Sequence, residues 1–343
     1  MPTSIKDIAK LAGVSHATVS RALHDSPLIS VRTKTTIQAL AAQVGYQPSA
    51  AARSLKTNRS QVLGVIVSHI ADPFFSEILQ GIDDVAQSHG YSLFIAAAQH
   101  DPAREHAIIQ TMREHRVDGV ILCSPQLTSE QSFQLQSYNI PIVAINNQGS
   151  EAYRYSISHD DVDGSRQACQ HLVNLGHARI AYLGDGSSGR TTRDRFTGYR
   201  QVMEELGFSI PPGYTHEALQ NNAAEGLMAA DYYLDLSIRP TAIICYNDML
   251  AVGVLKGLNQ AGVRVPADIS LTGFDNIFYS DYTQPPLTTI DQPKRFLGAE
   301  ATNMMLKQLS HNSGSMGGLG EVKKLKGMLL IRQSTAPPCI DKT

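Results

Sequence analysis

Apolar residues recur along most of the chain in short uninterrupted runs that alternate with longer amphipathic stretches. Runs such as VLGVIV at 62–67 and AIIC at 242–245 are typical of parallel strands buried on both faces of a sheet. We expect a first series with strands at about 62–68, 91–98, 119–123 and 141–145 and helices at 74–89, 103–115 and 129–138. A second series has expected strands near 155–159, 179–184, 242–246 and 269–274 and helices near 161–175, 194–206, 223–236 and 248–261. This alternation predicts two doubly wound α/β units.

The N-terminal segment has a different pattern, with two short amphipathic helices separated by a glycine. In IKDIAKLAGVSHATVSRALH, at 5–24, the small Ala9 lets two helices cross closely and Gly13 supplies the turn. Val14 and Val19 are spaced to fill the gap between the helices. The spacing predicts a helix-turn-helix, and an ordinary helical hairpin is the alternative for this segment taken alone.

The second helix of this unit is the candidate for reading DNA bases. Ser15 is placed to cap it, so that the three residues after Ser15 form its N-terminal end, where a recognition helix meets base edges. Arg21 lies one turn further along, where it could make a bidentate contact with guanine. Lys6 and Ser20 are expected to contact phosphates. The candidate DNA-binding residues of this unit are Lys6, Ser15, His16, Ala17, Thr18, Ser20 and Arg21.

Charge is distributed unevenly along the 343 residues, although the net charge is only -2. Residues 1–59 contain eight basic and two acidic residues, a net charge of +6, and the remainder contains 21 basic and 29 acidic residues, a net charge of -8. A small basic head on a large acidic body suits a head that binds a polyanion such as nucleic acid. A solvated basic face is the alternative explanation.

Composition narrows the class of protein further. No apolar run is long enough to span a membrane and the first residues lack the apolar core of a signal peptide, so we expect a cytoplasmic protein. The cysteines are far apart and form no CxxC pair, so neither a disulfide framework nor a zinc site is indicated. We expect Cys123, Cys169, Cys245 and Cys339 to be reduced and structural.

A third helix is expected at 32–44, ended by Gly45, and is followed by GYQPSAAARSL at 45–55. The order of helix-turn-helix, this segment and the apolar run at 62–67 resembles the LacI/GalR (lactose-repressor) family of bacterial transcription regulators. Further similarities continue in order to the end of the chain, at DPFFSE (72–77), RVDGV (116–120), GH (176–177), GFDN (273–276), PLTTI (286–290) and RQST (332–335).

The resemblance implies an all-helical helix-turn-helix head and a two-lobed body like that of periplasmic binding proteins, with crossover strands between the lobes. We expect the head at 1–59, with a hinge helix at about 49–57, and the body at 60–343. The first lobe would comprise about 60–159 and 292–324, and the second about 160–291 and 325–343. Residues 294–310 would return to the first lobe, and 314–320 would form a flexible loop.

Polar residues follow the ends of the predicted strands, where ligands bind in sheets of this kind. Asn247, Asp275 and Arg195 suit bidentate contacts with adjacent hydroxyls, and the resemblance implies that these three line an effector pocket. Phe74 offers an apolar face to a ring, or could be core. Several family members have an aromatic residue where this chain has Asn221, so we expect no stacking from that side. The candidate effector-binding residues are Asp72, Phe74, Asn146, Asp160, Arg195, Asn221, Asn247 and Asp275.

This chemistry favours a sugar or nucleoside-like effector. For each Asn and Asp candidate the alternative is a helix cap or turn former, since both residue types often occupy strand-to-helix turns. No metal ligands or cofactor are expected.

An enzyme is the main alternative class. GDGSSG at 184–189 matches the glycine pattern of dinucleotide-binding loops, and Glu204 and Glu205 lie at about the expected distance after it. These acids fall inside the next predicted helix, however, and Arg190, Arg193 and Arg195 crowd the turn. A solute-binding transport protein is a third class, but it would have an export signal instead of a basic head. We therefore interpret the chain as a DNA-binding regulator, most simply a repressor, without enzymatic activity.

Two expectations concern assembly on DNA. One head reads a single half-site, so a homodimer on a near-palindromic operator is expected, and the C-terminal tail has no heptads that could join dimers into tetramers. The segment SAAARSL at 49–55 favours a helix but is too short to be stable alone. By resemblance, paired hinge helices enter the minor groove, where Leu55 would act as a wedge and Ala52 would favour helix formation. A plain linker helix is the alternative.

Overall fold

A computed structural model gives the fold and describes residues 4–46, 59–126, 140–148, 153–186, 189–311 and 320–339. The chain divides into two compact units, Met1–Ser60 and Gln61–Thr343, which we describe separately as the head and the body.

The described residues of the head form three helices around a small apolar core. Its helices are α1 (Ile5–Ala12), α2 (His16–Leu23) and α3 (Val31–Gln43). Gly13 ends α1 with a φ of 65°, a left-handed conformation that glycine adopts without strain. The side chains buried between the helices are those of Ile8, Ala9, Val19, Ala22, Ile37 and Ala41. The predicted helix-turn-helix is therefore confirmed.

The first sheet of the body has six strands in the order β11-β5-β4-β3-β1-β2, and all its pairings are parallel. Its strands are β1 (Val62–Val67), β2 (Ser92–Ala97), β3 (Gly119–Cys123), β4 (Ile142–Ile145), β5 (Tyr155–His159) and β11 (Glu321–Leu325). The central strands β1, β3 and β4 are almost completely buried, as their uninterrupted apolar sequences predict.

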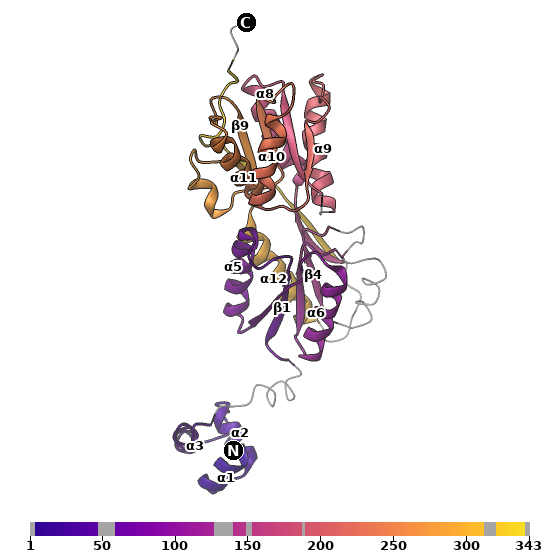
Figure 1. Cartoon of the computed structure of the whole chain (residues 1–343). Helices are drawn as coiled ribbons and strands as arrows, with labels where there is room; N and C mark the ends of the chain where they lie inside the picture. The colour runs from indigo at the N-terminus through magenta and orange to yellow at the C-terminus, as the bar shows by residue number, and fades with distance from the viewer. Residues whose placement is uncertain are drawn as a thin grey trace. The chain divides into compact units, whose positions relative to one another are not determined.

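The second sheet also has six strands, in the order β12-β10-β9-β8-β6-β7. Its strands are β6 (Ile180–Asp185), β7 (Thr215–Ala218), β8 (Ala242–Cys245), β9 (Ser270–Asp275), β10 (Thr288–Asp291) and β12 (Met328–Leu330). Only the edge strand β12 is antiparallel to its neighbour among the pairings of this sheet that the structure describes. The two sheets define the two lobes of the body, which Figure 1 shows one beyond the other.

Helices cover both sheets, as expected for doubly wound units (Figure 1). They are α5 (Pro73–Ser88), α6 (Pro102–Glu114), α8 (Asp161–Asn174), α9 (Arg190–Glu205), α10 (Ala223–Leu234), α11 (Asp248–Gln260), the 3-10 helix η1 (Phe278–Asp281) and α12 (Lys294–His311). Helix α12 follows β10 of the second sheet but packs against α5 and the first sheet. Gly81 and Gly298 let α5 and α12 approach closely, since a Cβ on Gly298 would lie 2.1 Å from the Ile78 carbonyl oxygen.

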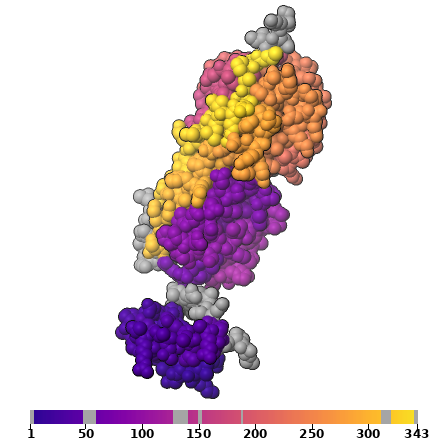
Figure 2. All heavy atoms as spheres, turned by 90° about the vertical axis from the view of Figure 1, so that its left-hand side faces the viewer, coloured from indigo at the N-terminus to yellow at the C-terminus, as the bar shows by residue number. Residues whose placement is uncertain are grey.

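The chain crosses between the lobes three times within the described residues. It passes from β5 to β6, returns from β10 to α12, and crosses again from β11 to β12. The last crossing belongs to the C-terminal segment, yellow in Figure 2, which runs along the outside of both lobes. These crossovers confirm the two-lobed fold class that the resemblance implied.

Several expectations about single elements were wrong. The strand at 155–159, which we placed in the second series although the expected first lobe extends to 159, is β5 of the first sheet. Strands β7, β10, β11 and β12 were not predicted individually, because they are short and lie at or near sheet edges where polar residues are tolerated; β11 has the sequence EVKKL. Helix α9 begins at Arg190 instead of 194. The helix expected at 129–138 lies outside the described residues, as does all but the last residue of the loop at 314–320.

Candidate functional site

Helix α2 of the head, the candidate recognition helix, presents one polar face to solvent. Ser15 caps α2, since its Oγ accepts a hydrogen bond of 3.1 Å from the backbone N–H of Thr18. Val19 and Ala22 on the same helix are buried. The opposite face exposes the side chains of His16, Ala17 and Arg21.

The other DNA-binding candidates of the head divide into three groups. Lys6 is exposed on α1, and Ser20 and Thr18 are half-buried on α2. Thr18 also lies 2.9 Å, Oγ1 to Oγ, from Ser15, so both side chains serve the cap. Ala52 and Leu55 lie outside the described residues. The structure therefore places the exposed imidazole and guanidinium on one accessible helix face.

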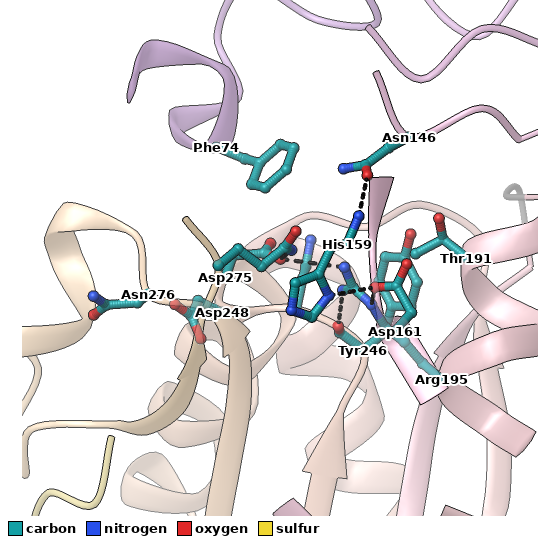
Figure 3. A network of polar contacts seen from close by, with 12 residues as sticks. Phe74, Asn146, His159, Asp161, Thr191, Arg195, Tyr246, Asp248, Asp275 and Asn276 are labelled. Carbon is teal, nitrogen blue, oxygen red and sulfur yellow. Dashed lines mark hydrogen bonds and ion pairs between the residues drawn. The ribbon is translucent and has the colours of Figure 1, made fainter. Parts of the chain in front are cut away.

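The body contains a cavity between its two lobes, at the carboxyl ends of the parallel strands. Both lobes contribute side chains to it, and Figure 3 shows Phe74 and Asn146 of the first lobe facing Asp275 and Arg195 of the second. The residues that line it are Ser68, Asp72, Phe74, Phe75, His100, Ser124, Gln126, Asn146, Gln148, Asp185, Thr191, Arg195, Asn221, Tyr246, Asn247 and Asp275.

Arg195 of α9 is the centre of a buried hydrogen-bond network (Figure 3). Its Nε donates to Asp161 Oδ1 at 2.9 Å, and its Nη1 donates to the Tyr246 carbonyl at 2.5 Å. Nη2 lies 3.4 Å from Asp275 Oδ1, a longer contact. The guanidinium carbon also lies 3.7 Å from the ring centroid of Phe274, which favours a fixed planar orientation.

The two carboxylates that share Arg195 differ in their surroundings. Burial opposes ionisation of Asp161, but the nearby Arg195 guanidinium outweighs it and lowers the pKa of Asp161. Burial raises the pKa of Asp275 to about 8, against the opposing effect of Arg195. Asp275 Oδ1 also accepts a hydrogen bond of 2.6 Å from Gln292 Nε2. Asp161 is therefore the principal counter-ion of Arg195.

A buried lysine, Lys294, contacts the backbone of the loop after β9. The Lys294 ammonium donates to the carbonyl oxygens of Asp275 and Asn276, at 2.5 and 2.9 Å. Both residues have positive φ, 113° and 53°, a conformation uncommon for side chains larger than glycine. Lys294 also lies 3.3 Å, Nζ to Oε1, from Glu77 of α5. The loop that presents Asp275 is thus tied to the first lobe.

Two of the polar candidates are helix caps as well as cavity residues. Asp72 Oδ1 accepts from the Phe74 N–H at 3.0 Å, and Asn247 Oδ1 accepts from the Leu250 N–H at 2.8 Å. Burial raises the pKa of Asp72. Asp72 and Asn247 therefore act as helix caps, the alternative that we considered for such residues, and they also line the cavity.

Asp160 is the candidate that the structure does not bring to the cavity. It caps α8 through the Asp163 N–H at 3.2 Å, and it forms an ion pair of 2.9 Å with Lys324 of β11. The reason is that β5 lies next to β11 in the first sheet, so the carboxylate after β5 meets a lysine of the neighbouring strand. Its successor Asp161, which we did not select, contacts Arg195 instead.

The remaining candidates all line the cavity. Asn146 Oδ1 accepts from the His159 N–H at 2.9 Å, and Asn221 accepts through its backbone carbonyl from Asn247 Nδ2 at 3.2 Å. Phe74 is only 8% exposed and packs edge-to-face on Phe75, so it belongs to the core and to the cavity wall at once.

Sequence reasoning missed Gln148, which joins the two lobes beside the cavity. Its side-chain carbonyl accepts from the Thr191 N–H at 3.0 Å, and its backbone carbonyl accepts from the Arg190 N–H at 3.1 Å. It thereby caps α9, whose N-cap residue Gly189 has no side chain. No sequence signal identifies this contact. Thr191 could have been found, because it lies four residues before Arg195 and so on the same helix face.

The dinucleotide alternative finds no support in the geometry. Glu204 and Glu205 lie in the last turn of α9 and not at the end of the next strand. Glu205 Oε2 accepts from Arg166 Nη2 at 2.8 Å, an exposed pair on neighbouring helices. The acids thus do not occupy the position from which such a residue binds a ribose.

The described residues form neither a metal site nor a membrane-spanning helix. No group of three His, Cys, Asp or Glu residues there is arranged to hold a metal ion, and no helix there is long and apolar enough to cross a membrane. Of the cysteines, Cys123, Cys169 and Cys245 are buried and Cys339 is exposed, each as a free thiol.

Comparison with known proteins agrees with this two-part organisation. Residues 60–317 match the family model "Periplasmic binding proteins and sugar binding domain of LacI family", and residues 4–49 match "Bacterial regulatory proteins, lacI family". The HTH-type transcriptional repressor PurR of Haemophilus influenzae (strain PittEE) is 32% identical over 331 residues, which is 96% of this chain and 98% of that protein. The repressor CytR of Escherichia coli (strain K12) is 34% identical over 332 residues, 97% of this chain and 96% of that protein.

Solved structures give the same result. The lac repressor dimer bound to operator and the anti-inducer ONPF superposes with a TM-score of 0.87 at 27% identity, covering 98% of this chain and 100% of that one. A LacI family regulator from Enterococcus faecium with bound ribose has a TM-score of 0.70 at 26% identity and covers 80% of this chain and 99% of that one. A helix-turn-helix head on such a body defines a DNA-binding transcriptional regulator. The chain belongs to the LacI family of bacterial regulatory proteins.

Proposed function

We propose that this protein is a transcriptional repressor that binds a near-palindromic operator as a homodimer and changes its operator affinity when a small polar effector binds between the lobes. The observation that supports this most strongly is the combination, in one chain, of an exposed recognition-helix face and a polar interlobe cavity centred on Arg195. The repressor names of PurR and CytR favour repression over activation. These relatives are not enzymes, which favours a function without catalysis.

Operator binding is assigned to α2 and to the hinge segment 49–57 at the end of the head. His16, Ala17 and Arg21 would contact base edges in the major groove, with Lys6 and Ser20 on phosphates. Ser15 and Thr18 would act mainly by capping the helix. The test is selection of bound duplexes from a random library by the full-length protein. Enrichment of a near-palindromic sequence is expected, and binding without sequence preference would contradict the proposal.

Effector binding is assigned to the cavity. Asp72, Phe74, Asn146, Arg195, Asn221, Asn247 and Asp275 line it, and they offer carboxylate, amide and guanidinium groups with one aromatic face. The lac repressor structure with ONPF and the Enterococcus faecium regulator with ribose support a ligand site in such bodies. Asp275→Ala should abolish the effect of effector on operator affinity, while operator affinity without effector persists. Loss of both, with a lower melting temperature, would favour a purely structural role for Asp275.

A further inference from the structure

The loop after β9, residues 275–282, connects three parts of the body. Asp275 at its start lines the interlobe cavity. Ile277 is the N-cap residue of η1 and is buried. The exposed rings at the end of the loop, which we call the aromatic surface, are those of Phe278, Tyr279 and Tyr282. A single short segment of the second lobe therefore leads from the cavity to the aromatic surface.

The side chain of Ile277 is buried in the first lobe, although its backbone belongs to the second. It is 2% exposed and belongs to an apolar cluster whose other buried members come from the first lobe, among them Phe75 and Ile78 of α5 and Leu297 of α12. Met249 of α11 also packs against this cluster. If the lobes separated on this side, Ile277 would meet water, which is unfavourable for an apolar side chain. The contact thus favours the arrangement in which the lobes touch here.

A buried ammonium group holds the same loop. Lys294, the first residue of α12, lies 3.3 Å, Nζ to Oε1, from Glu77 of α5. The same Nζ donates to the carbonyl oxygens of Asp275 and Asn276. Figure 3 shows these two loop residues on the side of the second lobe that faces Phe74 of α5. Glu77 therefore positions Lys294, and Lys294 holds the start of the loop.

Hydrogen bonds join Ile277 to η1. The Ile277 N–H and the Ser280 hydroxyl both donate to Oδ2 of Asp248, at 2.9 and 2.5 Å. The Ser280 N–H donates to the Ile277 carbonyl at 2.9 Å. A displacement of Ile277 would therefore also displace η1 and the aromatic surface that it carries.

We propose that Ile277, Lys294 and Glu77 form an interlobe latch, which couples the contact between the two lobes to the position of η1. While the lobes touch on this side, the latch holds the loop in the observed conformation. When they separate, Ile277 loses its place in the first lobe and the loop is released. The cavity residue Asp275 and the aromatic surface then change together, because both belong to the released segment.

Hydrogen exchange of the full-length protein tests the latch from the first lobe. Glu77→Gln weakens the ion pair that positions Lys294, so peptides of the loop 275–282 should exchange at least about threefold faster. Asp83→Asn removes the same charge from an exposed position of α5 and should leave exchange of the loop unchanged. Wild-type exchange of the loop in Glu77→Gln would overturn the role of the ion pair.

The apolar part of the latch is tested from the second lobe. Ile277→Ala should speed exchange in the loop and also in peptides of α5 and α12, which belong to the first lobe. Ile269→Ala makes the same truncation in the core of the second lobe and should leave α5 and α12 unchanged. Ile277→Val keeps most of the contact and should stay close to wild type. Faster exchange confined to the loop in Ile277→Ala would overturn the latch.

A last measurement concerns the aromatic surface, and it rests on the proposed homodimer. If two copies pair through this surface, Ile277→Ala should raise the dimer dissociation constant severalfold in sedimentation experiments, although no aromatic residue is changed. Ile269→Ala should keep the wild-type constant. A wild-type constant in Ile277→Ala, with exchange of the loop already faster, would overturn the coupling of the latch to the aromatic surface. A monomeric wild type would contradict the proposed homodimer and leave the exchange tests of the latch valid.

Discussion

Single polar residues at strand ends have two roles in this protein, because the turn after each strand also begins a helix. Asp72 and Asn247 cap helices and line the cavity, whereas Asp160 caps a helix and meets Lys324. The difference comes from the neighbour of each strand and not from the residue type. A capping aspartate becomes a ligand-facing one only where no lysine of the adjacent strand reaches it.

Arg21 is the residue of the head that we expect to discriminate most strongly between DNA bases. It is exposed on the recognition helix, and a bidentate contact with guanine discriminates by about 1–3 kcal/mol against other bases. We therefore expect Arg21→Ala to relax the preference at one operator position per half-site. The measurement is a series of binding titrations with single base substitutions, with Arg32→Ala on α3 as the control. Equal weakening for all sequences would identify Arg21 as a phosphate contact.

His177 is a buried histidine of the second lobe. Its ring forms hydrogen bonds with Thr241, Ser270 and the Ala336 carbonyl. These contacts hold the C-terminal segment against the second sheet. Burial lowers the pKa of His177 below its ordinary value near 6.5, so the unfolded chain takes up this proton more readily than the folded one. The stabilisation is complete above about pH 6.5 and is lost as the pH falls below it.

We expect the free energy of unfolding to fall between about pH 7 and pH 5.5, and His177→Gln to reduce that slope. Chemical denaturation at several pH values measures it. His89→Gln, at an exposed helix end, is the control and should keep the wild-type slope. A His177→Gln protein with the full wild-type slope would mean that other histidines with lowered pKa, such as His171, account for the effect.

The site could be predicted from the sequence only where a residue lies at a strand end or where the family resemblance marks it. Arg195, Asn247 and Asp275 were expected together, and the cavity brings them together. Gln292 and Lys294 were not expected, because they approach Asp275 from a crossover segment and carry no local signal. Contacts between distant segments depend on sheet order, which hydrophobic periodicity does not encode.

Helices α10 and α11 pack closely against each other through glycines. A Cβ on Gly226 of α10 would lie 2.1 Å from the Leu250 carbonyl oxygen, and one on Gly253 of α11 would lie 2.1 Å from the Ala223 carbonyl oxygen. These are backbone atoms of the facing helix or its first turn, which cannot move aside as a flexible side chain can. The spacing of α10 and α11 therefore depends on both glycines.

We expect Gly253→Ala to destabilise the body by about 1–3 kcal/mol, the usual cost of overpacking, although alanine has the higher helix propensity. Urea denaturation measures this difference. Lys256→Ala on the exposed face of the same helix should change stability by less than about 0.5 kcal/mol. A stabilised Gly253→Ala variant would show that the two helices can separate without cost.

Buried strands were easier to predict from the sequence than strands at the sheet edges. The strands VLGVIV and AIIC were expected because strands covered on both faces need continuous apolar sequence. Strands such as MLL at 328–330 were missed, because an edge strand of three residues leaves no periodicity to detect. The strand YSISH at 155–159 was placed in the second series, although the expected lobe bounds put it in the first lobe, where it lies. Its sequence does not indicate its neighbours.

The segment 49–55 is the element on which our proposed switch depends, and it lies outside the described residues. An isolated helix of this length is marginal in water, so we expect it to fold only on operator DNA. Hydrogen exchange of residues 50–56 should show no protection in the free protein and protection in the complex. Ala52→Gly should weaken operator binding by roughly 1 kcal/mol per subunit. Protection already present without DNA would contradict the folding switch.

In the whole body, three crossovers among the described residues connect the two lobes, so the proposed effector, bound between them, would be able to change their relative arrangement. Two heads must be held at the spacing of one operator for such a change to affect DNA binding. The proposed homodimer therefore needs a surface of the body that holds the second copy. A cluster of exposed aromatic side chains, formed by Phe278 and Tyr279 of η1 and Tyr282 at its C-cap, offers one on the second lobe.

Phe278 and Tyr282 are 68% and 72% exposed, with ring centroids 4.7 Å apart, an arrangement that leaves a large apolar area in water. Aromatic residues are enriched in the cores of protein–protein interfaces, and two like surfaces can pair about a two-fold axis. We expect the double variant Phe278→Asp/Tyr282→Asp to sediment as a monomer while wild type sediments as a dimer. Ile238→Asp, which places a carboxylate at another exposed apolar position, should remain dimeric. The monomer should also bind the operator far more weakly, because each half-site is then occupied independently. A double variant that remains dimeric would show that the two copies meet through a different face.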